Sequence, residues 1–506
     1  MKNFIYKWRP LIIILLIAAA LRITSLLTRG NFWFDENFSI HFSTLPFWAD
    51  TWKYWVLETN PPLYTFFLRL YLPFINPDNE ILARLPSLIF GLMTVALLYI
   101  FAEKILSKKA AIISSIMLAF SVLHIFASAE TRVYSLLALL TTASFFIFYK
   151  IVLEQKESKK LWVIYTLLNI LLLYSHLTSL AVVLAQFLIL QFSATKKEIS
   201  KTWFICQFIS FTLWFVWFMP SIISKLNLDS GNAWFFENSG NIIILLLYPL
   251  INSLDNNLLN TLFTLLLFAG FYIFINMVKE AKYVLKRNTL LFIATWALLP
   301  IILSSMVSSF TIKYIMISYP AFFMLTASII EKYITGKKSF FVFIMFMAIV
   351  FAPPTIKFIS EPLFSWNILN DYLAKKDNGH SIVLIPFIQE ISFKKYYNGE
   401  IPLVSLYFKQ DNFSLEERVV KYNWQIQNTT KEEIYKFILL NIKKNGADKI
   451  FLLDQRNKFK MVENVLLENH WSLIERSPTV GSDNYIIEFN APNYQTTPAI
   501  GLPANR

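Results

Sequence analysis

Long apolar stretches recur along the first 356 residues of this chain, and they limit the folds it can adopt. A transmembrane helix needs roughly 20 predominantly apolar residues. Only 16% of the residues are charged, against roughly 25% in soluble domains, which excludes an ordinary soluble enzyme. We therefore expect about eleven transmembrane helices, at 10–28, 82–103, 110–127, 133–152, 161–176, 177–193, 202–224, 257–278, 289–308, 313–330 and 339–356.

The basic residues indicate how these spans are oriented. With the N-terminus inside, the inner loops hold 20 Lys and Arg residues and the outer loops hold seven. Because Lys and Arg accumulate in cytoplasmic loops, the net charge of +13 reflects topology and indicates no nucleic-acid partner. We expect a multi-pass protein of the plasma (cytoplasmic) membrane whose odd number of spans places its C-terminal part outside.

Two segments are not expected to cross the membrane. Within the transmembrane domain, 1–356, residues 29–81 form a long outer loop whose tryptophans suit interfacial helices. Residues 357–490 have a soluble composition and predict a small extracytoplasmic α/β domain, followed by a flexible tail at 491–506. Its expected strands are Ser381–Phe387, Ile401–Phe408, Lys449–Asp454 and Tyr485–Phe489, and its expected helices are Gln389–Asn398, Lys431–Asn445 and Lys460–Asn469.

Polar groups that persist near the outer ends of the spans are the candidates for function, because ionisable residues are costly in a membrane. Asp35 and Glu36 follow the first span among aromatic residues. Adjacent carboxylates point in different directions, so one can act as a base while its neighbour binds substrate or orients the loop. The structural alternative is a solvated turn with a helix cap.

Cations collect at the same outer face. Arg132 follows Glu130 by two residues, so it can bind a phosphate bidentately while Glu130 holds it in place. Lys313 opens a late span and Arg84 opens the second one. The structural alternative for both arginines is an anchor that reaches the lipid headgroups.

Four further residues are candidates for binding a substrate. Asn60 and Tyr64 flank a Pro-Pro pair, which mainly predicts a structural corner. Tyr134 and His176 lie at the outer ends of their spans, where a lone His is as often structural as functional. Because no spacing of His or Cys residues predicts a tight metal site, we assign no metal and no other cofactor, with a divalent metal as the alternative.

Together these motifs carry a resemblance to a known group of enzymes. The elements are Trp33-Phe34-Asp35-Glu36, Pro61-Pro62-Leu63-Tyr64, Ala83-Arg84-Leu85-Pro86-Ser87 and Glu130-Thr131-Arg132-Val133-Tyr134. In this order the chain resembles the bacterial and archaeal glycosyltransferases of the GT-C superfamily over about residues 1–330. It looks most like family 39, the protein O-mannosyltransferase group, to which the lipid A aminoarabinose transferases are related. Two positions depart from that pattern: Asn60 stands where His is frequent, and Lys313 where Arg is frequent.

The resemblance implies a GT-C fold and an inverting transfer of a sugar from a polyprenyl-phosphate donor to a glycolipid, protein or cell-wall acceptor on the outer face. The roles it implies are Asp35 as base, Glu36 and Glu130 as supports, Arg132, Lys313 and Arg84 as phosphate ligands, and Asn60, Tyr64, Tyr134 and His176 as substrate contacts. The alternative is a lipid-linked glycan flippase or another transporter, which would need polar or glycine-broken helices near the midplane. With only 11 glycines and polar residues on one face, the enzyme is favoured. A glycan ligase or polymerase would have its large outer loop late in the chain, whereas here it is the first loop.

Overall fold

The computed structural model divides the chain into two compact units. The first comprises Met1–Arg29 and Ser39–Glu361, and the second comprises Gly30–Phe38 and Pro362–Arg506. The structure describes residues 2–58, 60–193, 196–226, 287–305, 312–334, 336–360, 365–408, 414–416, 418, 429–455, 459–477 and 484–492.

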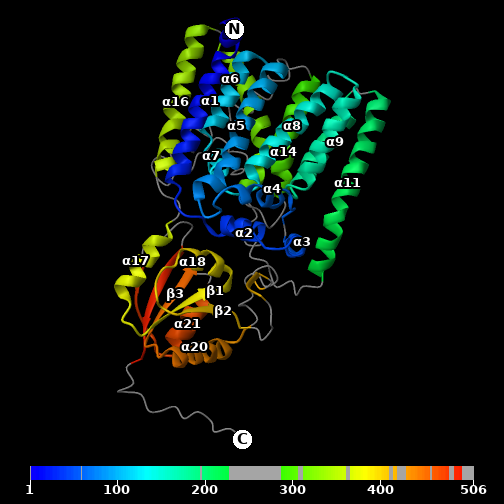
Figure 1. Ribbon diagram of the computed structural model, residues 1–506. Helices are drawn as coiled ribbons and strands as arrows, with labels where there is room; N and C mark the ends of the chain where they lie inside the picture. The colour runs from blue at the N-terminus through cyan, green and yellow to red at the C-terminus, as the bar shows by residue number, and fades with distance from the viewer. Residues whose placement is uncertain are drawn as a thin grey trace. The chain divides into compact units, whose positions relative to one another are not determined.

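The first unit is a bundle of apolar helices (Figure 1). Within the described ranges, six helices are long and apolar enough to cross a membrane, or seven if one bent pair forms a single span. The chain is therefore a multi-pass membrane protein. The helices are α1 (Lys2–Thr28), α5 (Glu80–Ile105), α6 (Lys108–Phe120), α7 (Val122–Ser128), α8 (Tyr134–Val152), α9 (Lys159–Leu173), α10 (Ser179–Phe192), α11 (Lys197–Leu226), α14 (Arg287–Ser305), η3 (Ile312–Ser318), α15 (Tyr319–Tyr333) and α16 (Lys337–Ser360).

Every expected span that falls on described residues coincides with one or two of these helices. The expected span at 257–278 lies outside the described residues, so the total of eleven stays a prediction. α1 and α16 are far apart in sequence but lie side by side in the bundle (Figure 1).

The bent pair α6 and α7 positions the loop that carries Glu130 and Arg132. The two helices meet at Ser121 with a bend of 64°. Bending a helix leaves carbonyl groups without intrahelical partners. The fully buried Arg22 on α1 donates to two carbonyl groups at the break, Leu118 O at 3.3 Å and Ala119 O at 3.1 Å, so α1 stabilises the break.

Short helices follow α1, as expected of an interfacial loop: α2 (Phe34–Ser43), α3 (Trp48–Leu57), α4 (Leu63–Tyr71) and the turn η1 (Leu72–Phe74). Trp48 and Trp52 on α3 are 51% and 42% exposed, which suits side chains at a membrane interface. The Trp217 indole of α11 donates to Trp55 O at 2.7 Å and attaches α3 to the bundle.

The second unit is a small α/β domain built on a five-stranded sheet of order β2-β1-β3-β5-β4. β1 pairs in parallel with β2 and β3, whereas β5 is antiparallel to β3 and β4. The strands are β1 (Ser381–Pro386), β2 (Leu403–Leu406), β3 (Lys449–Gln455), β4 (Ser472–Arg476) and β5 (Asn484–Asn490), and the helices are α17 (Trp366–Lys376), the turn η4 (Phe387–Gln389), α18 (Glu390–Tyr396), α20 (Lys431–Asn445) and α21 (Lys460–Glu468).

Both faces of this sheet are covered. Alternate residues of a strand point to opposite faces, so Ile382 and Leu384 pack with α20 and α21, while Val383 and Ile385 pack with α17 and α18. A sheet buried on both sides needs strands that are nearly continuously apolar, which explains the sequence Ser-Ile-Val-Leu-Ile-Pro in β1.

Each strand and helix expected in this domain is present, with bounds that differ by at most a few residues. Among the described residues of this domain, the helix α17 and the strand β4 were not anticipated. β4 is a short edge strand whose residues are mostly exposed, so it lacks the alternation of apolar and polar residues that marks a strand.

Candidate functional site

The loop between α7 and α8 holds a buried carboxylate paired with a cation. Glu130 has a side chain that is 0% exposed, and its Oε1 accepts a hydrogen bond from Lys313 Nζ at 3.0 Å. Lys313 enters from η3, which is far away in sequence. Because a buried carboxylate is costly without a counter-charge, the pairing with Lys313 holds the Glu130 side chain in place.

Aromatic rings surround the Lys313 ammonium. Its Nζ lies 4.8 Å from the centre of the Phe126 ring and 5.2 Å from that of Tyr134. The guanidinium of Arg29 lies 4.1 Å from the same Phe126 ring. Arg29 and Phe126 were not among the expected site residues, because neither belongs to a recognisable motif. Two cations thus share one ring, and positive charge is concentrated next to Glu130.

Arg132 is held from a different side. Its backbone N–H donates to Glu130 O at 2.8 Å in a tight turn, and its Nη1 donates to Ser39 Oγ on α2 at 2.9 Å. We expected Glu130 to hold Arg132, but in the structure the Glu130 carboxylate forms its ion pair with Lys313. Ser39 is therefore a contact that no motif indicated.

Tyr64 connects to this loop through a serine. Tyr64 Oη lies 2.8 Å from Ser87 Oγ, and Ser87 Oγ lies 3.5 Å from Arg132 O. Tyr64 is on α4 and Ser87 on α5, and both are buried. Arg84 is also buried, three residues before Ser87 on α5.

Tyr134 and His176 lie together in the same unit. Their ring centres are 5.9 Å apart, and the His176 ring is 4.8 Å from that of Tyr314, the neighbour of Lys313. His176 Nδ1 accepts the backbone N–H of Thr178 at 3.2 Å, which assigns the proton of the neutral ring to Nε2. This imidazole can therefore act as a hydrogen-bond donor.

Asn60 is engaged within its own loop. Its side-chain amide donates to Glu58 Oε1 at 3.0 Å, consistent with the structural corner that the Pro-Pro pair predicts. The backbone N–H of Leu63 then donates to Tyr174 O at 2.9 Å, which joins this corner to the turn before His176.

The second unit contains the other two acidic candidates, within a segment that we call the acidic turn, Gly30–Phe38. α2 begins here, and both carboxylates lie in its first turn. Glu36 is fully buried, and its Oε2 accepts the backbone N–H of Trp33, the residue before the helix, at 3.3 Å. That contact is half of a capping box, so Glu36 helps to start the helix, while Asp35 is half-buried beside it.

In the part of the chain that the structure describes, no three His, Cys, Asp or Glu side chains come close enough together to hold a metal ion. The chemical character of the first unit's cluster is instead that of an anion site. Lys313, Arg29 and Arg132 supply positive charge, and Tyr64, Tyr134 and His176 supply hydroxyl and imidazole groups that can bond a polar ligand.

Comparisons with known proteins agree with this architecture. Residues 59–224 match the sequence family described as dolichyl-phosphate-mannose-protein mannosyltransferase. No curated protein matches the chain in sequence. Among solved structures, ArnT from Cupriavidus metallidurans in the apo state is 12% identical with a TM-score of 0.58, over 94% of this chain and 97% of that one.

Two further structures extend the comparison. The undecaprenyl-phosphate complex of the same ArnT has 12% identity and a TM-score of 0.57, again over 94% of this chain and 97% of that one. The Archaeoglobus fulgidus oligosaccharyltransferase tethered with an acceptor peptide has 10% identity and a TM-score of 0.54, over 98% of this chain and 75% of that one. These likenesses show that the chain shares the fold of the ArnT and oligosaccharyltransferase structures.

Proposed function

We propose that this protein is a glycosyltransferase of the GT-C superfamily that moves a sugar from a polyprenyl-phosphate donor to an acceptor at the outer face of the plasma membrane, with inversion at the anomeric carbon. The observation that carries the proposal is the buried Glu130–Lys313 pair with Arg132 two residues away. The undecaprenyl phosphate bound to ArnT supports a donor of this class.

The leaving group explains why cations are needed. When the bond between the anomeric carbon and the phosphate oxygen breaks, its electron pair stays on that oxygen, and a phosphodiester becomes a phosphomonoester with more negative charge. Preorganised cations stabilise such developing charge. In the proposal, Arg132 binds the phosphate through its planar fork, and Lys313 contacts it while Glu130 keeps the ammonium in place. Arg84 is the third phosphate ligand.

The acceptor requires a base. Its hydroxyl oxygen attacks the anomeric carbon from the face opposite the phosphate, and its proton moves to a carboxylate. Asp35 is the proposed base, because its neighbour Glu36 already caps the helix. Tyr64, Tyr134, His176 and Asn60 are the proposed sugar contacts.

A turnover assay tests the reaction. The purified full-length protein is incubated with radiolabelled undecaprenyl-phosphate mannose, and in parallel with the glucose and aminoarabinose donors, together with a membrane extract as acceptor. We expect release of undecaprenyl phosphate with at least one donor. The matched control is Lys196→Ala, which removes an exposed cation 3.5 Å from Glu157 and should leave turnover unchanged. Turnover of no donor by the wild-type protein would overturn the proposal.

Reporter fusions test the sidedness. A reporter that is active only outside the cytoplasm should function when fused after Pro362 and fail when fused after Arg287. Activity at both positions, or only at the second, would move the proposed site to the other face of the membrane.

A further inference from the structure

Within the second unit, side chains of α17 and α18 form hydrogen bonds with the backbone of the acidic turn. The backbone N–H of Phe32 donates to Tyr396 Oη at 2.9 Å, and the indole Nε1 of Trp366 donates to Phe32 O at 3.1 Å. The backbone N–H of Trp366 donates to Asn31 Oδ1 at 3.0 Å. Both polar groups of the Phe32 backbone are therefore bonded to side chains of α17 and α18, which are more than 300 residues away in sequence.

Apolar packing of Phe32 and of the aromatic residues around Asp35 adds to these hydrogen bonds. Phe32 is completely buried, with Lys395 Nζ 4.7 Å from the centre of its ring. Trp33 packs against the cluster that contains Trp366, while Phe34 and Phe38 pack against the cluster formed by Phe387 and Ile388. The aromatic residues on either side of Asp35 in sequence thus pack against the cores of the α/β domain.

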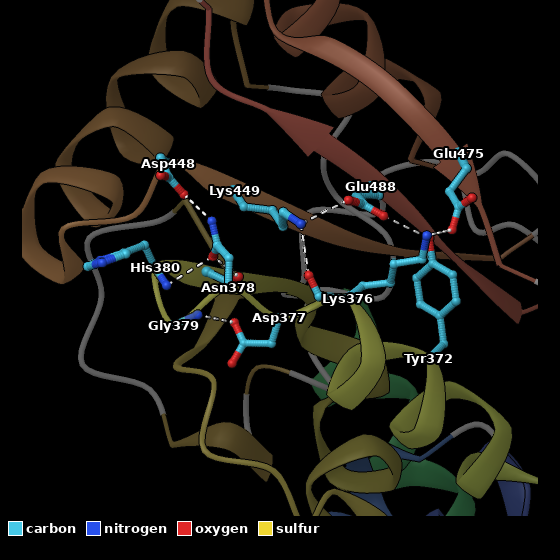
Figure 2. Close-up of polar contacts among 11 residues, drawn as sticks. Tyr372, Lys376, Asp377, Asn378, Gly379, His380, Asp448, Lys449, Glu475 and Glu488 are labelled. Atoms are coloured by element: carbon cyan, nitrogen blue, oxygen red, sulfur yellow. Dashed lines mark hydrogen bonds and ion pairs between the residues drawn. The ribbon is translucent and has the colours of Figure 1, made fainter.

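α17, which supplies Trp366, is itself fastened to the sheet at its other end (Figure 2). Tyr372 Oη donates to Glu488 Oε2 at 3.2 Å, and Glu488 Oε1 lies 3.0 Å from Lys449 Nζ. Lys449 Nζ also donates to Lys376 O at 2.8 Å, and Lys376 Nζ lies 2.8 Å from Glu475 Oε1. These contacts join the C-terminal half of α17 to β3, β4 and β5.

We infer that Trp366 and Tyr396 are positioning residues for Asp35, so the C-terminal domain sets the geometry of the acidic turn. The inference rests on the proposed function, in which Asp35 is the base. A base must lie within hydrogen-bond reach of the proton it removes. Two hydrogen bonds hold the backbone of Phe32, which lies two residues before the start of α2 and three residues before Asp35.

Conservative variants test the inference in the full-length protein. Tyr396→Phe removes the hydroxyl that accepts from Phe32, and Trp366→Phe removes the indole donor, while both keep an aromatic ring in the core. The matched control is Tyr397→Phe, which removes the hydroxyl of the next residue, whose bond goes to Ile401 O at 3.1 Å. Two readouts are measured: hydrogen–deuterium exchange of the peptide containing residues 30–38, and kcat and donor KM with the donor that the wild-type protein uses best.

We call Tyr396→Phe and Trp366→Phe the clamp variants. For each of them we expect faster exchange in residues 30–38 and a kcat that is roughly tenfold lower, which is the effect of losing one net hydrogen bond. Donor KM should not change, because the phosphate ligands belong to the other unit. In an Asp35→Asn background the clamp variants should have no further effect, because a positioning residue acts through the group that it positions.

The possible failures are distinct. If exchange at residues 30–38 in the clamp variants equals that in Tyr397→Phe, the hydrogen bonds to the Phe32 backbone do not hold the acidic turn, and the inference is overturned. It is also overturned if exchange rises and kcat stays at the wild-type value while Asp35→Asn is inactive. If Asp35→Asn itself retains full turnover, the base assignment fails first and the inference fails with it.

Discussion

Glu130 and Glu36 are both completely buried carboxylates, but the two units hold them differently. Glu130, in the membrane unit, is paired with the ammonium of Lys313. Glu36, in the acidic turn, accepts a backbone N–H at the start of α2. The first arrangement orders a cation that can then meet an anionic ligand. The second orders the backbone around a neighbouring carboxylate.

The capping contact of Glu36 gives the adjacent acids Asp35 and Glu36 different environments. A carboxylate that caps a helix is occupied by backbone donors and is poorly placed to accept a proton from a substrate. The residue just before it is rotated by about 100° around the helix. Asp35 therefore has a different direction and a different environment from Glu36, although the two are adjacent in sequence.

The largest expected effect separates these two acids. Asp35→Asn keeps the size of the side chain but removes the proton acceptor, and general base catalysis contributes about 10²–10⁴-fold. Single-turnover transfer at saturating donor should fall by that factor, with donor binding unchanged. Glu36→Gln is the control and should lose far less turnover, because its role is to start the helix. Retention of more than about half of the turnover by Asp35→Asn would remove it as the base.

The second prediction concerns the buried ion pair. Glu130→Gln leaves the Lys313 ammonium, which is only 16% exposed, without its counter-charge. Breaking a buried pair from one side costs up to about 3–5 kcal/mol, so thermal unfolding of the detergent-solubilised protein should shift clearly downward. The double variant Glu130→Gln/Lys313→Met should recover part of that loss, because no uncompensated charge remains. A double variant less stable than Glu130→Gln would show that the pair is not held by charge.

Arg132→Lys is expected to have a smaller effect, on the donor. Lysine keeps the charge but lacks the planar fork that binds a phosphate bidentately and contacts Ser39. We expect donor KM to rise and kcat to fall by about tenfold together, with a larger loss for Arg132→Ala. Steady-state kinetics at varied donor concentration measures both. An Arg132→Lys variant with wild-type constants would make Arg132 an anchor at the lipid headgroups.

The smallest effect is expected at the exposed end of α17, between Lys376 and Glu475 (Figure 2). Their hydrogen bond raises the pKa of Lys376 and lowers the pKa of Glu475. The stability that Glu475 contributes is therefore lost as the pH falls through its lowered pKa, and that from Lys376 is lost as the pH rises through its raised pKa. Because the pair is exposed, Lys376→Met should barely change the thermal midpoint at pH 7, whereas Lys449→Met, beside the buried Glu488, should lower it more.

The fold of each unit could be predicted from the sequence, because its causes are local. A span needs only enough consecutive apolar residues. β1 is a run of apolar residues, and α20 is bounded by its own capping residues, so both can be read from a short stretch of sequence. α17 and β4 were not predicted. The exposed β4 has no alternating pattern of apolar and polar residues, and α17 follows the last span with no strand before it.

The sequence suggests a set of candidate site residues but not their arrangement. Asp35, Glu130, Arg132 and Lys313 are predicted site residues because charge is expensive beside a membrane. The pairing of Glu130 with Lys313 joins residues 183 positions apart, and the contact of Arg132 with Ser39 joins residues 93 positions apart. No local pattern encodes which cation a carboxylate meets.

The same reason applies to the acidic turn. From the sequence, residues 30–38 are part of the loop after the first span and were expected in the transmembrane domain. Their place in the second unit depends on contacts such as the bond between Phe32 and Tyr396, 364 positions away. Hydropathy and charge determine which segments enter the membrane, since each residue contributes to that choice by itself. Which unit holds a short turn depends on packing between distant residues, and only the folded chain brings those residues together.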